Sequence, residues 1–273
     1  MDTRHLLLTF IVFTHSLIAS MWWVAGSLMG LSRRASRQWM LATLANGAAL
    51  TFSAVSLSWH SPTHDLTRAV VAGSLVVWGA VSMRRGLAYF LKLNHSDRQH
   101  LALAGSVVAF NTLLCWPMGW NTLALAASGI GMGWILGRTA QEAFEPLRIE
   151  FGRATAWCNA VLVMLAVALF AGATIVDLLP PGWVPAALLH DAQERLVWSV
   201  TTSIVLSILS AFVLGYVVVM RLVRRLEHLS HHDALTGLLN RRAIEYLLDR
   251  EDQRLQRFGD PFSVLLIDID HFK

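Results

Sequence analysis

Two carboxylates follow an apolar run in the segment VLLIDIDHFK, residues 264–273. Residues 262–267 are almost continuously apolar, which predicts a strand buried on both faces, and Asp268 and Asp270 follow it directly. A carboxylate at the end of a buried strand is costly unless a cation or a hydrogen-bond donor faces it. Such oxygen ligands suit a hard divalent cation that holds substrate phosphates, and the alternative is a capping or turn aspartate.

The elements that must position these acids lie immediately upstream. Residues 236–237, Thr-Gly, interrupt a helical pattern, and apolar residues at helical spacing predict a new helix from about Arg241. Gly259 ends this helix, and Pro261 prevents it from resuming. The predicted order is therefore a turn, a helix and a buried strand that ends at Asp268.

Two motifs in this region resemble the opening of the GGDEF domain, the catalytic domain of bacterial diguanylate cyclases. They are DALTGLLNRRA at 233–243 and LLIDIDHFK at 265–273, in the family's order and with a helix between them. The resemblance is confined to residues 229–273 and implies the start of an α/β, nucleotide-cyclase-like fold there. It also implies GTP as the substrate, Mg²⁺ or Mn²⁺ as the cofactor and a homodimer for catalysis.

The resemblance gives the residues around the acids individual roles. Asp268 matches the family's catalytic metal ligand, and Ile269 matches the residue whose backbone carbonyl also reaches the metal. His271, Phe272 and Lys273 match the turn whose backbone amides face the GTP phosphates. These five residues form the implied catalytic, metal and substrate-binding set.

Other matched residues have structural roles in the family. Asp233, Leu235 and Thr236 match the turn that joins the signalling helix to the catalytic domain, and Asp270 matches an acid that holds the phosphate turn. The family's Gly-Gly-Asp/Glu-Glu-Phe signature does not occur in these residues. We therefore expect an N-terminal fragment cut within the domain, which is inactive by itself and poorly stable over 233–273.

The remainder of the chain has the composition of a multi-span membrane protein. Hydrophobic residues make up 55% and charged residues 15% of the chain, whereas about 25% is usual for charged residues in soluble domains. The basic residues stand at the ends of apolar segments and form no single patch, which argues against nucleic-acid binding despite the net charge of +4. Helices of about 20 apolar residues cross a bilayer. Seven spans are predicted, at 6–31, 39–59, 69–90, 100–116, 118–137, 154–178 and 197–220.

The basic residues also predict the orientation of these spans. Those in the connections after the first, third, fifth and seventh spans far outnumber Arg4, Arg68 and Arg195 on the opposite side. The first group is Arg33, Arg34, Arg37, Arg84, Arg85, Lys92, Arg98, Arg138, Arg148, Arg153, Arg221, Arg224 and Arg225. The N-terminus is therefore predicted outside and the C-terminal domain in the cytoplasm, as a multi-pass protein of the bacterial inner membrane.

Polar residues inside the predicted spans leave two interpretations open. His15, Asn46, Asn111, Asn121 and Asn159 form hydrogen bonds between helices, or they line a pocket for a ligand or cofactor. Glycines spaced at four, at 129, 133 and 137, predict close helix packing within one subunit, and the alternative is a dimer interface. The fourth and fifth spans are predicted to join through a tight turn at CWPMGW, residues 115–120.

The predicted organisation has three parts. Residues 1–221 form a seven-span sensor or anchor, 222–232 a signalling-helix linker that continues the last span, and 233–273 the start of the GGDEF domain. The predicted function is a membrane-bound diguanylate cyclase regulated by its membrane region. The alternatives are a fusion with a phosphodiesterase domain and a degenerate receptor that only binds GTP. A transporter is disfavoured because no matching pair of broken spans is seen.

Overall fold

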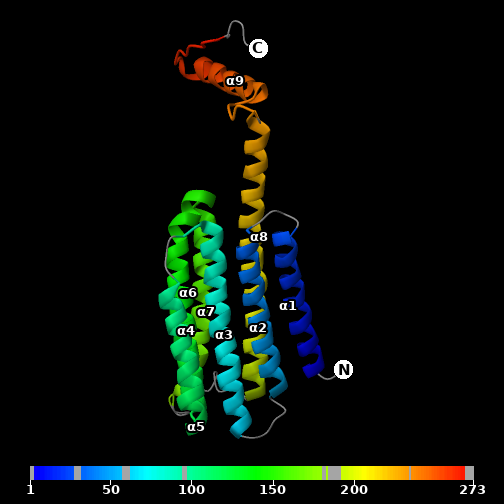
Figure 1. Ribbon diagram of the computed structural model, residues 1–273, viewed down its shortest axis with the longest axis vertical. Helices are drawn as coiled ribbons and strands as arrows, with labels where there is room; N and C mark the ends of the chain where they lie inside the picture. Colours follow the sequence, from blue (N-terminus) through cyan, green and yellow to red (C-terminus); the bar gives the residue numbers. More distant parts are fainter. Residues whose placement is uncertain are drawn as a thin grey trace. The chain divides into compact units, whose positions relative to one another are not determined.

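The computed structural model describes residues 3–27, 32–56, 62–93, 97–179, 183, 192–233 and 235–267. These parts of the chain are almost entirely helical (Figure 1). Contacts divide the chain into two units, Met1–Val217 and Val218–Lys273. Helix α8 runs through the boundary between them.

The first unit is a bundle of long helices that lie side by side (Figure 1). Its elements are α1 Thr3–Ser27, α2 Arg33–Ser56, α3 Pro62–Leu91, α4 Arg98–Phe110, the π-helix η1 Asn111–Cys115, α5 Trp116–Met118, α6 Asn121–Phe151, α7 Arg153–Leu178 and the first part of α8, Ala192–His231. Within the bundle, α2 packs against α1 and α3, and α6 packs against α3 and α7.

Five segments of the described chain are long and apolar enough to cross a membrane. They are His5–Ser27, Asp65–Leu91, Arg98–Met118, Arg153–Val176 and Val197–Leu226. The other two predicted spans correspond to α2 and α6, which are helices of 24 and 31 residues. Both are rich in Ala, Gly, Ser and Thr, which lower their apolar character but allow close contact with the helices on either side.

The tight turn predicted at residues 115–120 is confirmed. Helix α4 continues through η1 and α5, and Gly119 then adopts the left-handed conformation with φ of 71°. The N–H of Trp120 donates to the carbonyl of Cys115 at 3.0 Å, and α6 begins at the next residue. The chain reverses here because glycine adopts positive φ without a steric cost.

Two of the three glycines predicted to pack within the chain, Gly129 and Gly133 of α6, do so, whereas a β-carbon at Gly137 would meet no atom within 4 Å. A β-carbon at Gly129 would lie 2.8 Å from the hydroxyl oxygen of Thr174, and one at Gly133 would lie 3.5 Å from a methyl group of Val167. Both neighbours belong to α7. The glycines therefore allow α6 and α7 to approach each other closely.

The second unit contains the end of α8, a turn and helix α9, Arg241–Phe258. The predicted continuation of the last span is confirmed, since α8 runs unbroken from Ala192 to His231. Helix α9 begins where the apolar spacing predicted, and Gly259, with φ of 75°, ends it.

The predicted strand at residues 262–267 is not present. These residues have no regular secondary structure, and the side chains of Leu265 and Leu266 are 83% and 93% exposed. A strand requires a neighbour for its backbone hydrogen bonds. In the described residues, the isolated antiparallel bridge between His232 and Leu239 is the only β pairing, and it is not adjacent to this segment.

Candidate functional site

The turn after α8 is organised by one oxygen of Asp233. Its Oδ1 accepts hydrogen bonds from the backbone N–H of Leu235 at 3.1 Å, the backbone N–H of Thr236 at 3.0 Å and the hydroxyl of Thr236 at 3.0 Å. Aspartate favours such turns because its short side chain reaches the backbone two and three residues ahead. The structure therefore brings together the three residues predicted to form the signalling turn.

Backbone hydrogen bonds close the same turn. The N–H of Asp233 donates to the carbonyl of Leu238 at 2.8 Å, and the N–H of Gly237 donates to the carbonyl of Asp233 at 2.9 Å. Gly237 has φ of 70°, a conformation that side chains disfavour. The bridge between His232 and Leu239 completes a compact loop whose two ends are adjacent.

Helix α9 starts from this loop at a defined residue. The Oδ1 of Asn240 accepts a hydrogen bond from the N–H of Ala243 at 3.0 Å, which is a standard N-cap contact. Ala243 is 3% exposed, so the residue that donates to the cap is shielded from solvent. The side chains of Arg241 and Glu245 form an ion pair of 2.8 Å one turn apart on the exposed face.

The electrostatics of the turn follow from these contacts. The N–H and hydroxyl of Thr236, together with the N–H of Leu235, lower the pKa of Asp233 by stabilising its carboxylate. The ion pair with Glu245 raises the pKa of Arg241. Asp233 is therefore a fully charged structural anchor at neutral pH.

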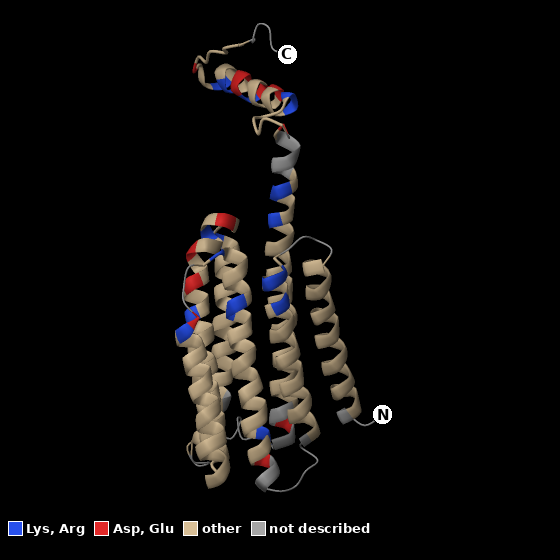
Figure 2. Ribbon diagram, in the orientation of Figure 1, with Lys and Arg blue, Asp and Glu red and all other residues tan. Residues whose placement is uncertain are grey.

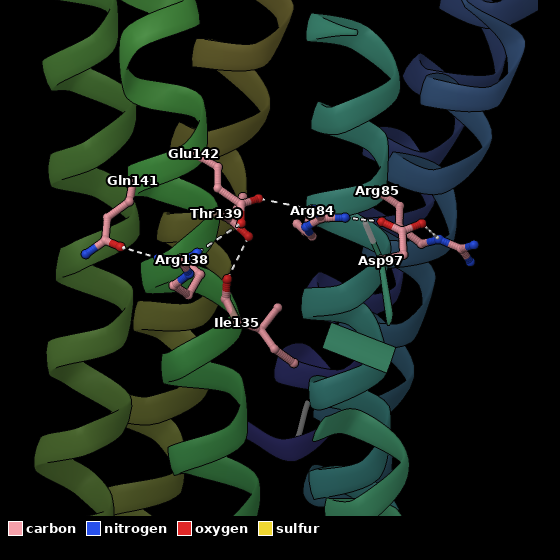
Figure 3. A network of polar contacts seen from close by, with 8 residues as sticks. All are labelled: Arg84, Arg85, Asp97, Ile135, Arg138, Thr139, Gln141 and Glu142. Atoms are coloured by element: carbon pink, nitrogen blue, oxygen red, sulfur yellow. Dashed lines mark hydrogen bonds and ion pairs between the residues drawn. The ribbon is translucent and has the colours of Figure 1, made fainter. Parts of the chain in front are cut away.

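A second polar cluster lies in the bundle, around Arg84 (Figure 3). The guanidinium of Arg84 is 1% exposed, pairs with Asp97 and contacts Glu142 at 3.2 Å. Asp97 also accepts from Arg85 at 2.9 Å, and Arg138 lies 3.8 Å from Glu142. The cluster therefore ties α3, the residue before α4, and α6 to one another.

From the sequence, Arg84 is predicted only as one of the positive charges at the ends of spans. The acids that pair with it, Asp97 and Glu142, stand near the ends of other predicted spans. An arginine followed by acids in two later connections is the signal that predicts such pairing. The signal does not identify which acid reaches the buried arginine.

The residues that carry the implied chemistry are outside the described part of the chain. Asp268, Ile269, Asp270, His271, Phe272 and Lys273 all fall there. Within the described residues, no three His, Cys, Asp or Glu side chains gather in a way that suits a metal ion. The structure therefore places the signalling turn and α9 but leaves the metal and phosphate residues as predictions from sequence.

The turn and α9 coincide with a known family. The family model described as "Diguanylate cyclase, GGDEF domain" matches residues 230–273. This segment belongs to the GGDEF domain family. The resemblance stated from the two motifs is thereby confirmed, over the same part of the chain.

Individual relatives of the GGDEF segment agree with this. Diguanylate cyclase DgcM of Escherichia coli (strain K12) is 45% identical over 53 residues, which is 19% of this chain and 13% of that protein. Diguanylate cyclase DosC of the same strain is 45% identical over 60 residues, 20% of this chain and 13% of that protein. A protein of Caulobacter vibrioides named "Uncharacterized signaling protein" is 41% identical over 49 residues, 18% of this chain and 6% of its own length. No solved structure matches the chain.

These matches cover a small part of each protein. The chain spans about an eighth of the length of the DgcM and DosC sequences that it matches. The matched family model begins at residue 230, after the five segments that are long and apolar enough to cross a membrane, and does not cover the helical bundle.

Proposed function

We propose that this chain belongs to a membrane-anchored diguanylate cyclase, which joins two GTP molecules into cyclic di-GMP and releases two diphosphates. The GGDEF match over residues 230–273 is the observation that carries this proposal. The closed turn at Asp233 supports it, because the residues that match the family's signalling turn form one hydrogen-bonded unit. The proposed domains are residues 1–221, 222–232 and 233–273.

The proposed chemistry uses one GTP from each of two subunits. The 3′-hydroxyl of one nucleotide attacks the α-phosphate of the other, so a homodimer must bring two catalytic domains face to face. Asp268 and the carbonyl of Ile269 would hold Mg²⁺ or Mn²⁺, since a carboxylate and a carbonyl are the oxygen donors that hard divalent cations prefer. The bound cation would neutralise charge on the phosphates. The backbone amides of His271, Phe272 and Lys273 would bind the phosphates of GTP.

The proposed membrane topology has seven spans, with the N-terminus outside and the catalytic domain in the cytoplasm. The packing of α2 between α1 and α3, and of α6 between α3 and α7, supports two spans beyond the five most apolar ones. Within the bundle, Lys and Arg residues gather toward the end at which α6 finishes and α7 begins (Figure 2). An excess of basic residues on one side is typical of the cytoplasmic face, here that of the bacterial inner membrane.

The proposed regulation acts through α8. This helix has 40 residues and passes from the last span to the turn at Asp233 without a break. A stimulus that changes the position of α8 would change how two GGDEF domains pair and would shift the population of productive dimers. The 273 residues alone lack the Gly-Gly-Asp/Glu-Glu-Phe signature, and we expect them not to convert GTP.

The proposal is tested with the complete coding sequence that contains these residues. Purified membranes should form cyclic di-GMP from GTP, and Asp268→Asn should lower turnover at least about a hundredfold, because metal stabilisation of charge amounts to several kcal/mol. The matched control is Asp252→Asn, an exposed acid on α9 that should leave turnover unchanged. Activity retained in Asp268→Asn contradicts the metal role, and absence of product from the unaltered complete protein contradicts the cyclase assignment.

A further inference from the structure

The helical bundle contains a cavity of about 170 Å³. Its lining comes from α1, α2, α3, α6, α7 and α8, all within the first unit. Most of the lining is apolar and includes Trp22, Met83 and Phe170. A dry cavity of about 150 Å³ in another protein accommodates benzene, so this volume fits a molecule with one aromatic ring.

Polar side chains from four helices, α2, α6, α7 and α8, also line this cavity. Asn46 on α2 donates to the hydroxyl oxygen of Ser207 on α8 at 3.1 Å, and its amide nitrogen lies 3.3 Å from Nε2 of His15. Ser203 and Ser210 on α8 are part of the same lining. Empty cavities in proteins are apolar, whereas this one also has hydrogen-bonding side chains among its mostly apolar lining residues.

Asn159 on α7 is one polar group of the lining without a hydrogen-bond partner among the described residues, and the buried indole Nε1 of Trp39 is another. The side chain of Asn159 lines the cavity and is 7% exposed, and it forms no hydrogen bond to any residue that the structure describes. A buried amide that lacks a hydrogen-bond partner destabilises a protein, and more so in a bilayer, where water does not satisfy it. The other buried asparagine in the spans, Asn111, lies outside the cavity; its amide nitrogen donates to the hydroxyl of Ser128 at 2.9 Å, while its Oδ1 has no hydrogen-bond partner among the described residues.

We propose that this cavity binds a small neutral molecule with about one aromatic ring and a hydroxyl or carbonyl group that hydrogen-bonds to Asn159. The volume of the cavity limits the size of the ligand. None of the described lining residues is charged, which excludes an anion or cation as the ligand. The amide of Asn159 offers both a donor and an acceptor, so it matches either oxygen group. A molecule of this class also partitions into the bilayer, from which the bundle is reached.

The position of the cavity links its occupant to α8. Ser203, Leu206, Ser207, Ser210, Ala211 and Leu214 of this helix all face it. Because α8 is continuous as far as His231, an occupant contacts the same helix that leads to the GGDEF segment. The cavity is therefore placed to receive a chemical signal, and its ligand binding does not depend on the proposed cyclase activity.

Binding is tested with radiolabelled phenol and benzene on the purified full chain in lipid nanodiscs, with empty nanodiscs as the background. We expect saturable binding at one site, with phenol bound about three- to tenfold more tightly than benzene, the ratio that one net hydrogen bond supplies. Asn159→Leu, of similar size, should lose the preference for phenol and keep benzene binding. Ala166→Phe, which fills the cavity, should bind neither phenol nor benzene. Asn111→Leu should bind both as the unaltered chain does, because residue 111 lies outside the cavity.

Two results would overturn the proposal. One is binding to the unaltered chain that does not exceed that of empty nanodiscs, which indicates a cavity filled only by water or lipid tails. The other is phenol binding that Ala166→Phe leaves unchanged, which places the phenol outside the cavity. Helicity of each variant is checked by circular dichroism, and Ala166→Leu replaces Ala166→Phe if the larger side chain prevents folding.

Discussion

At the level of single residues, the turn that precedes α9 depends on the carboxylate of Asp233. Three donors from two residues converge on its Oδ1, and the adjacent Gly237 provides the positive φ that closes the loop. A neutral carboxyl group would accept these hydrogen bonds more weakly than the charged one. The stability of the turn should therefore depend on the charge of one side chain.

This dependence gives a pH prediction. The pKa of Asp233 is lower in the folded turn than in the unfolded chain, because the N–H and hydroxyl of Thr236 and the N–H of Leu235 stabilise the carboxylate. The stabilisation of the turn by the charged carboxylate is fully present above the pKa of the unfolded chain, near 4. It is lost as the pH falls through the lower pKa of the folded turn. Hydrogen-exchange protection of residues 235 and 236, corrected for intrinsic exchange, should be constant at neutral pH and decrease below about pH 4.

Replacement of the side chain provides the matched test. Asp233→Ala should remove the protection of residues 235 and 236 at every pH, and Asp252→Ala on α9 should leave it unchanged. Protection that persists in Asp233→Ala would show that the backbone hydrogen bonds to Asp233 and Leu238 hold the turn without the carboxylate.

At the level of elements, α2 and α3 are held together by Trp39 over Gly86. The indole of Trp39 is 1% exposed, and its ring centre lies 4.8 Å from that of Trp22 and 5.5 Å from that of Phe90. A β-carbon at Gly86 would overlap the indole. The close approach of these two helices therefore requires a glycine at this position.

Gly86→Ala should lower the free energy of unfolding by about 1–3 kcal/mol, the usual effect of overpacking a core. The measurement is a denaturant titration of the chain in detergent micelles. The control is Gly105→Ala, where a β-carbon meets no atom within 4 Å and the higher helix propensity of alanine applies. Equal midpoints for the two variants would mean that Trp39 moves without loss of packing.

Arg84 connects three elements in a different way, through charge. It contacts Asp97 before α4 and Glu142 on α6, whose side chain is only 7% exposed. Arg84→Met should lower the free energy of unfolding by about 3–5 kcal/mol, because it removes the nearer of the two guanidinium groups that face the buried carboxylate of Glu142 and leaves only Arg138, at 3.8 Å. Unfolding of Arg84→Met is compared with that of Arg148→Met, whose partially exposed pair with Glu145 should matter little. Recovery of stability in the double variant Arg84→Met/Glu142→Gln would identify the loss of the contact with Glu142 as the cause.

At the level of the whole molecule, the number of spans determines which side of the membrane each helix end occupies. Asp65 near the start of α3 lies outside in the seven-span topology but in the cytoplasm if α2 does not cross. Arg225 on α8 follows the predicted span 197–220, at the very end of the apolar segment Val197–Leu226, and lies on the cytoplasmic side in both cases. One position therefore discriminates the two topologies, and the other serves as a reference.

Single cysteines at these positions, in a chain from which Cys115 and Cys158 have been removed, test the topology. A membrane-impermeant maleimide should label Asp65→Cys in intact cells and Arg225→Cys only after lysis. Failure to label Asp65→Cys until lysis would support five spans. Labelling of Arg225→Cys in intact cells would contradict the orientation predicted from the basic residues and would place the C-terminal end of α8 outside.

The sequence by itself determined the features that depend on neighbours along the chain. The cap at Asn240, the end of α9 at Gly259, the turn at Asp233 and the reversal at Gly119 form through contacts between residues a few positions apart. Residue type and spacing are sufficient for these because the partners are fixed by the covalent chain. The same holds for the motifs at 233–243 and 265–273, which together identified the GGDEF segment.

Only the tertiary structure decided which distant residues meet. The polar side chains of the spans had two open interpretations, and packing assigned Asn111 to Ser128 but left Asn159 facing a cavity. Packing likewise joined Arg84 to Glu142, and the apolar run at 262–267 did not form a strand because no described strand lies beside it. Contacts between helices or strands depend on how whole elements pack against one another, which local spacing does not encode.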